Sequence, residues 1–161
     1  MRGGVYYISI LSLILVGCAK KAELSREQSA MIVWKSPTIR YADMGFISDN
    51  GTLLKIEIYQ SGSAIMRLTI SNSSICMGKF QCLSKKSFNR SQLSPNYPDR
   101  ILENIFRGRA IFRGLNIERA RDGFTQSIYS EGRYDITYTV LDNRITFRDR
   151  ANKILIKVKK L

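Results

Sequence analysis

The sequence predicts a mainly β domain in which a curved antiparallel sheet, an incomplete barrel, is covered by one amphipathic helix. Three observations support this fold class. Apolar and polar residues alternate in several short runs separated by turn residues, most clearly between residues 134 and 159. A stretch at 98–107 changes to helical spacing. The length of 161 residues and the apolar content of 44% suit a single domain with one core.

The chain begins with the pattern of an export signal. Arg2 precedes an apolar run over residues 5–16, which is shorter than the roughly 20 residues of a membrane-spanning helix. The run ends in residues 15–18 (LVGC), which resemble a bacterial lipobox, where small residues precede a cysteine that is acylated before cleavage. We therefore expect a lipoprotein signal peptide over 1–17 and lipidation, palmitate included, at Cys18; an uncleaved anchor is the alternative.

The residues after Cys18 favour one membrane. Ala19 and Lys20 follow the cysteine, so the aspartate of the familiar inner-membrane retention signal is absent. Several acyl chains anchor a protein more stably than one reversible myristoyl group. We expect a lipid-anchored protein of the cell outer membrane that faces the periplasm.

Residues 18–37 are predicted to form an acylated tether and a short helix. Ser25 and Gln28 have the spacing of a capping box, which predicts a helix from Arg26 to about Val33. The single antiparallel β domain is then expected over 38–161.

The first strands of this domain follow from alternation and turns. A strand over 38–47 is followed by Asp49-Asn50-Gly51, a strong tight-turn signal. Residues 54–59 and 64–70 alternate and predict a hairpin with one apolar face.

Two cysteines remain after Cys18. Cys76 and Cys82 are separated by five residues that contain a Gly-Lys turn, which predicts a disulfide bond across a hairpin in an oxidising compartment. A redox role is disfavoured because the spacing is not C-x-x-C.

The covering helix is predicted at 98–107. Apolar residues recur there at helical spacing, Pro98 stands near the first turn and Gly108 marks the stop. Strands resume at 110–112 and 124–129. The last third predicts a three-strand meander over 134–140, 145–148 and 154–158, which gives seven to nine strands in all.

Charge and histidine content narrow the function. The chain has 26 Lys and Arg against 13 Asp and Glu, a formal charge of +13, and no histidine. Ser-His and Cys-His catalysis and histidine metal sites are therefore excluded. The sequence contains no Gly-rich phosphate loop, paired carboxylates or metal-spaced cluster, so we expect no enzyme activity, no cofactor and no metal. Lys and Arg residues are concentrated at 107–121 and 144–160. They form either a solvated face or a binding surface for anionic lipids. Because the chain is expected to be exported, nucleic acid is not an expected partner.

The order of these elements resembles the outer-membrane receptor of the bacterial lipoprotein-localisation pathway (LolB-like). The shared features are the lipobox, the hairpin of residues 53–70, the proline-led helix of 98–108 (PDRILENIFRG) and a charged turn before an alternating last strand. The resemblance covers about residues 39–161. It implies a LolA/LolB-like incomplete barrel whose cavity takes up the acyl chains of lipoproteins from a soluble periplasmic carrier. The chain departs from the family at 60–63 (QSGS), where the family projects an exposed leucine.

The resemblance also implies which residues line the acyl-chain cavity. The mechanism would be apolar binding energy, on the order of 0.8 kcal/mol per buried methylene, with no covalent chemistry. For each sheet position, ordinary core packing is the alternative. The expected lining residues are Ile56, Ile58, Met66, Leu68, Ile136, Phe147 and Ile156 on the sheet and Ile101, Leu102, Ile105 and Phe106 on the helix.

The sequence leaves a second function open. A non-catalytic lipoprotein could brace an outer-membrane assembly, or bind anionic lipid or lipopolysaccharide, without any cavity. An open apolar pocket favours the receptor, whereas a sheet filled by Tyr134, Tyr138 and Phe147 favours the bracing protein. In either role we expect a monomer.

Overall fold

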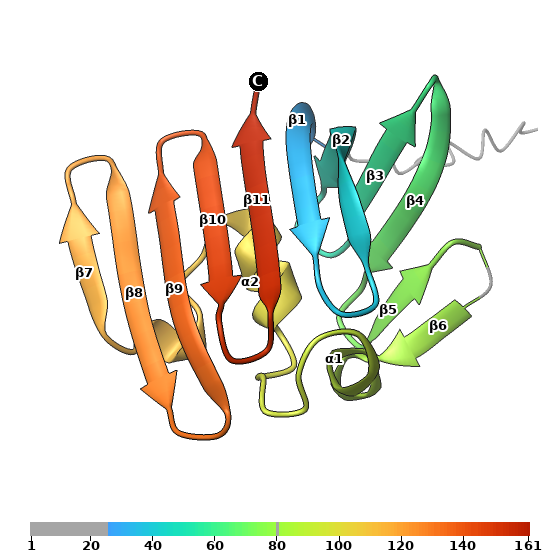
Figure 1. Cartoon of the computed structure of the whole chain (residues 1–161). Helices are drawn as coiled ribbons and strands as arrows, with labels where there is room; N and C mark the ends of the chain where they lie inside the picture. Colours follow the sequence, from blue (N-terminus) through green and yellow to red (C-terminus); the bar gives the residue numbers. More distant parts are fainter. Residues whose placement is uncertain (1–25, 80) are drawn as a thin grey trace, which may run out of the picture.

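The computed structural model describes residues 26–79 and 81–161 (Figure 1). They form one antiparallel sheet of eleven strands, which is not closed, and two short helices. The mainly β prediction is therefore confirmed, with more strands than the seven to nine expected.

The strands are ordered β6-β5-β4-β3-β2-β1-β11-β10-β9-β8-β7, so the first and last strands are neighbours in the centre. The two edge strands, β6 and β7, are joined through the helices (Figure 1). The elements are β1 (Arg26–Lys35), β2 (Arg40–Asp49), β3 (Leu54–Gln60), β4 (Ser63–Ile70), β5 (Ser74–Met77), β6 (Gln81–Ser84), α1 (Lys85–Gln92), α2 (Ile101–Arg107), the 3-10 turn η1 (Phe112–Gly114), β7 (Ile117–Ala120), β8 (Gly123–Ser130), β9 (Tyr134–Leu141), β10 (Arg144–Asp149) and β11 (Ile154–Lys160).

The helix predicted from Arg26 to Val33 is wrong, because these residues form β1. Ala30, Ile32 and Trp34 are fully buried and alternate with more exposed neighbours. This period of two matches a strand with one covered face, and pairing with both β2 and β11 outweighs the local capping pattern. The sheet thus begins before residue 38. Cys18 lies outside the described residues.

Other boundaries also differ from the predictions. The first predicted strand, 38–47, is β2 at Arg40–Asp49. Residues 110–112 are not a strand but lead into η1, and the strand of this region is β7. Residues 124–129 lie within β8, and the final three-strand meander is confirmed as β9, β10 and β11.

The predicted covering helix is present but shorter, and a second helix accompanies it. α2 starts at Ile101, since Pro98 and its neighbours form a turn in which the Ile101 amide donates to the Pro98 carbonyl. α1 (KKSFNRSQ) has one large apolar residue, Phe88, so no apolar period announced it. Its N-terminus is capped by Ser84, whose side chain accepts from the Ser87 amide.

The disulfide between Cys76 and Cys82 is present and joins directly paired positions of β5 and β6. This prediction is confirmed. The cross-link therefore fixes the register of the hairpin that forms one edge of the sheet.

Candidate functional site

The predicted lining residues come together on one face of the sheet. All eleven are at most 5% exposed and belong to one apolar cluster, which also includes Trp34 and Tyr138. They come from both ends of the chain, because β1 and β11 pair in the centre. Whether an acyl chain enters this cluster stays a prediction, but the sequence identified its members correctly as buried neighbours.

Helix α2 lies against this face behind β10 and β11 (Figure 1). Its four predicted residues, Ile101, Leu102, Ile105 and Phe106, are all buried, and the Phe106 ring centroid is 5.9 Å from that of Trp34. The seven residues of α2 therefore cover much of the apolar face at the centre of the sheet.

Gly108 ends α2 close to the sheet. Its φ is +67°, in the left-handed region, and a Cβ at this position would lie 3.4 Å from Val140 Cγ1. Glycine suits this position because it adopts positive φ without strain. The chain can therefore turn away from α2 while staying in contact with β9.

Aromatic side chains fill the part of the interior over β8 to β10. Tyr138 and Phe147 are fully buried with ring centroids 6.2 Å apart, and Tyr97 packs edge-on to Phe147 at 5.9 Å. Phe124 packs against Tyr138 at 5.7 Å. In this conformation protein side chains occupy this half, which is the arrangement expected for the bracing alternative.

Two hollows border α2. One, of about 300 Å³, is lined by residues that include Ile47, Leu54 and Phe106 and opens beside the C-terminal end of the helix. The other, of about 570 Å³, lies between α2 and the loop that follows it, with Asn104, Phe112 and Leu115 in its lining. Both volumes are in the range of small-molecule pockets, so the helix is bordered by open space on two sides.

A buried ion cluster holds the helices in place. The Glu103 carboxylate of α2 pairs with Lys85 of α1, whose Nζ lies 2.7 Å from Oε2, and with Arg107 one turn further along. Arg107 Nε lies 2.9 Å from Asp49 Oδ2 at the end of β2. The Lys85, Glu103 and Arg107 side chains are 5–6% exposed. The cluster therefore ties α1, α2 and the sheet together.

The acid strength of Glu103 reflects these contacts. Burial by itself raises the pKa of its carboxyl. The hydrogen bonds from Arg100 and Lys85 outweigh burial, and the pKa falls from its ordinary value of 4.5 to about 2. Burial is the largest single effect on the pKa of Asp49 and raises it, but the hydrogen bonds from Arg107 and the Gly51 amide and the positive charge of Arg107 together outweigh burial, so this pKa also lies below its ordinary value. Both carboxylates stay charged at neutral pH.

The loop that follows α2 is held by Gln126 of β8, which is fully buried. Its Oε1 accepts from the Ile111 amide at 2.8 Å, and its Nε2 donates to the carbonyls of Ile111 at 3.0 Å and Leu115 at 2.7 Å. The Tyr138 hydroxyl donates to the Arg109 carbonyl at 3.1 Å, and burial raises the pKa of this phenol. The Gln126 amide thus provides hydrogen-bond partners for three backbone groups of the loop.

The turn before α2 is held by a second buried pair. The Tyr97 hydroxyl donates to Asp149 of β10, which also accepts from the Asp135 amide and from Asn152. Burial raises the pKa of the Tyr97 phenol, and the Asp149 carboxylate raises it further. Polar contacts therefore fasten the wall formed by the helices on both sides of α2.

Sequence reasoning missed these fastening residues. The spacing of Glu103 and Arg107, four apart on a helix, is a signal for an ion pair. No local pattern relates Lys85 or Asp49 to them, because those contacts arise only when the helices meet the end of the sheet.

Within residues 26–79 and 81–161, no helix is long and apolar enough to cross a membrane. The same residues contain no group of three or more Cys, Asp or Glu side chains placed to hold a metal ion.

No family model matches the sequence, and it has no significant match among curated proteins. Function is therefore inferred from the geometry of the chain itself.

Proposed function

We propose that the protein binds the acyl chains of lipoproteins in its apolar interior beneath α2 and helps to localise them to the outer membrane, where lipid at Cys18 anchors the protein itself. One observation carries this proposal: an open sheet presents a continuous apolar face whose centre is covered by a helix of only seven residues. An incomplete barrel with helices at its mouth is the architecture that the resemblance to the lipoprotein receptor implies.

Because side chains fill the interior, α2 must move away from the sheet before the acyl chain of a lipoprotein can bind there. Exposing its four buried apolar residues costs roughly 1.5–3 kcal/mol each. A palmitoyl chain of about 14 methylenes gains roughly 11 kcal/mol on burial. The two quantities are of similar size, so burial of an acyl chain can offset the lost apolar contacts of α2, while the ion pairs of Glu103 and Arg107 add to the cost of moving the helix.

The chain has features that allow such an exchange. Among the described residues the links between α2 and the strands are side-chain contacts, such as that of Arg107 with Asp49, and no backbone–backbone hydrogen bond joins them, so the sheet can keep its pairing when the helix moves. Hollows border α2 on two sides and give space for displacement. The soluble carrier would release its cargo because apolar affinity is higher in this interior.

A transfer assay tests the proposal. The soluble form that starts after Cys18 is incubated with a carrier loaded with an acylated lipoprotein, and the two are then separated. We expect the cargo to pass to this protein and to remain on the carrier when Phe106 is replaced by Asp. Phe106→Leu is the matched control, since it keeps an apolar side chain and is expected to keep transfer.

The outcomes separate the two roles. If no cargo passes although acylated cargo is confirmed on the carrier, the receptor proposal is wrong. The aromatic filling by Tyr138 and Phe147 favours a second candidate in that case, a lipoprotein that braces an envelope assembly. Crosslinking in cells would then identify its partner.

A further inference from the structure

The face of the sheet turned away from α2 carries a block of cations on its four central strands. The inward residues of these strands are buried or half-buried, and the intervening residues point to the opposite face. In the register of the sheet they form three rows, which we call the basic face: Arg148, Leu155, Lys35 and Arg40; Thr146, Lys157, Val33 and Ala42; Arg144, Lys159, Met31 and Met44.

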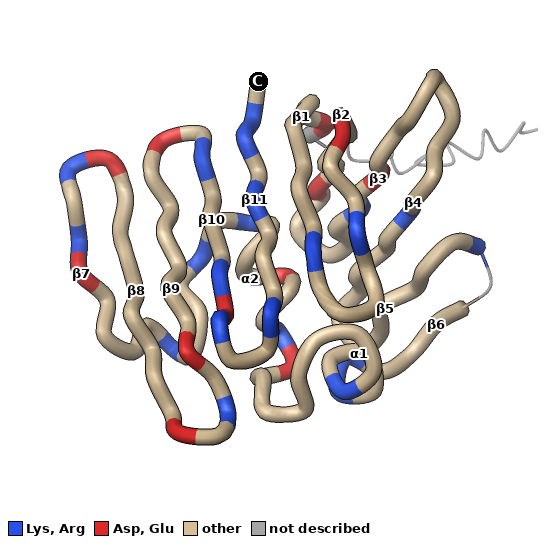
Figure 2. Tube along the Cα trace, in the orientation of Figure 1, with Lys and Arg blue, Asp and Glu red and all other residues tan. Residues whose placement is uncertain are grey.

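The basic face has no negative charge of its own. Six of its twelve residues are Lys or Arg, none is Asp or Glu, and none of these six cations takes part in an ion pair within the described residues. Figure 2 shows the blue bands on β10, β11, β1 and β2. The other carboxylates of these strands do not share this face: Asp43, Asp49 and Asp149 occupy the alternate, inward positions, and Glu27, further along β1, accepts from Ser48.

Apolar side chains alternate with the cations. Met31 is 41% exposed and Met44 38% exposed, while Val33 and Leu155 are half-buried. A hollow of about 290 Å³ runs between Met31, Arg144 and Lys157. Long basic side chains can lay their stems along such a surface and keep their charges in water.

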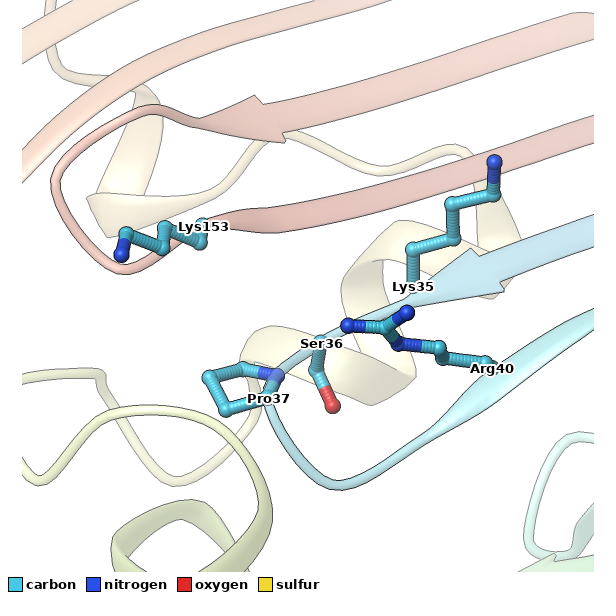
Figure 3. Close-up of a pocket in the computed structure, with 5 residues that line it drawn as sticks. All are labelled: Lys35, Ser36, Pro37, Arg40 and Lys153. Atoms are coloured by element: carbon cyan, nitrogen blue, oxygen red, sulfur yellow. The ribbon is translucent and has the colours of Figure 1, made fainter.

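At one end of the basic face lies a hollow of about 610 Å³, lined by Lys35, Ser36, Pro37, Arg40 and Lys153. Figure 3 shows that its cations do not converge: Arg40 extends toward Ser36, whereas the Lys35 and Lys153 amines point away in different directions. This spread does not form a cage for one phosphate. It suits an extended array of negative charges.

We propose that the basic face docks on an anionic bilayer surface, with its cations among phospholipid head-group phosphates and the two methionines at the level of the glycerol backbone. Charge complementarity carries the proposal, because cations near an anionic leaflet each add about 1 kcal/mol, a factor of about five. Single-stranded nucleic acid needs stacking side chains, and the basic face contains no aromatic residue. Protein interfaces are depleted in lysine, of which it has three. This inference rests on the proposed function in one respect, namely the lipid anchor at Cys18 that keeps the protein next to a bilayer.

Lysine footprinting of the full chain tests this surface without a mutation. The protein is reconstituted with vesicles of phosphatidylcholine alone or with 30% phosphatidylglycerol, treated with acetic anhydride and analysed by mass spectrometry. We expect Lys35, Lys157 and Lys159 to react at least fivefold more slowly in anionic than in neutral vesicles, relative to Lys79 in the β5–β6 turn. High salt should remove this protection, because the Debye length falls from about 10 Å at 0.1 M to about 3 Å at 1 M.

A charge-matched pair of variants adds a second test. Lys157→Gln with Lys159→Gln should weaken docking about 25-fold, measured by the protection of Lys35. Arg119→Gln with Arg121→Gln removes the same charge at edge strand β7 and the turn that follows it, and should leave the protection of Lys35 unchanged. Equal effects of both pairs would mean that net charge alone acts and would overturn the proposal.

Two results distinguish a lipid bilayer from other partners of the basic face. Equal lysine reactivity in both kinds of vesicle overturns lipid docking, and so does protection by an acidic protein or nucleic acid but not by vesicles. Acyl transfer is measured in a separate assay. If transfer fails but the lysines are protected in anionic vesicles, the proposed function alone is refuted. If transfer succeeds but the lysines are not protected, this inference alone is refuted.

Discussion

Replacement of Glu103 by Gln tests whether the buried ion cluster fastens the helices. The substitution keeps the size of the side chain but leaves Lys85, whose side chain is 6% exposed, without its carboxylate, and leaves Arg107 paired with Asp49 alone. Removal of one partner from a buried pair costs about 3–5 kcal/mol. We therefore expect the free energy of unfolding at pH 7 to fall by about that amount.

The pH dependence gives a sharper test of the same contact. The pKa of Glu103 falls from the ordinary 4.5 to about 2 in the folded chain, which corresponds to about 3 kcal/mol of stability. Because the folded pKa is the lower one, this stability is present above pH 4.5 and is lost as the pH falls toward 2. About 2 kcal/mol of it should be lost by pH 3.

Urea unfolding at several pH values, followed through Trp34, the only tryptophan of the chain, measures this difference. The gap in stability between the wild type and Glu103→Gln should narrow by about 2 kcal/mol between pH 6 and pH 3. Glu118→Gln, at an exposed position of β7, is the matched control and should run parallel to the wild type. A gap that stays constant with pH would refute the role assigned to Glu103.

Three further predictions concern stability and are read by urea unfolding. Reduction of Cys76–Cys82 should cost about 2 kcal/mol, because the closed loop is short; no change would show that the hairpin needs no cross-link. Gln126→Ala should cost about 3 kcal/mol and speed amide exchange in the loop after α2, since several buried backbone groups lose their partner; unaltered exchange would contradict this. Gly45→Ala should cost about 1–3 kcal/mol, because its Cβ would lie 2.2 Å from the Glu57 carbonyl oxygen; wild-type stability would show that β2 can shift without loss.

The parts of the fold that sequence predicts well are those with a clear period of two. The final meander shows strict alternation, and β9, β10 and β11 lie where it places them. Alternation also identifies which side chains are buried, as Ile56, Phe147 and Ile156 show. The pairing of β1 with β11, by contrast, joins segments more than a hundred residues apart, and no local pattern reports it.

The errors have physical causes that differ from one element to the next. β1 was predicted as a helix because the Ser25 and Gln28 capping pattern is a local preference, which two neighbouring strands override. α1 was missed because a mostly polar helix has no apolar stripe, and its stability depends on Phe88 and Lys85 meeting the rest of the core. The ion cluster was missed for the same reason, since tertiary contacts create it.

Quenching of Trp34 by an acyl chain tests the central claim most directly. Trp34 is fully buried and its ring lies 5.9 Å from Phe106 of α2, so a chain bound beneath this helix must approach it. We would titrate the protein with a diacylated lipopeptide whose acyl chains carry bromine, and with the same lipopeptide without bromine as control. Saturable quenching at one lipopeptide per chain, absent for the control, is the expected result. Binding of the brominated lipopeptide without quenching, or no binding at all, would contradict acyl uptake beneath α2.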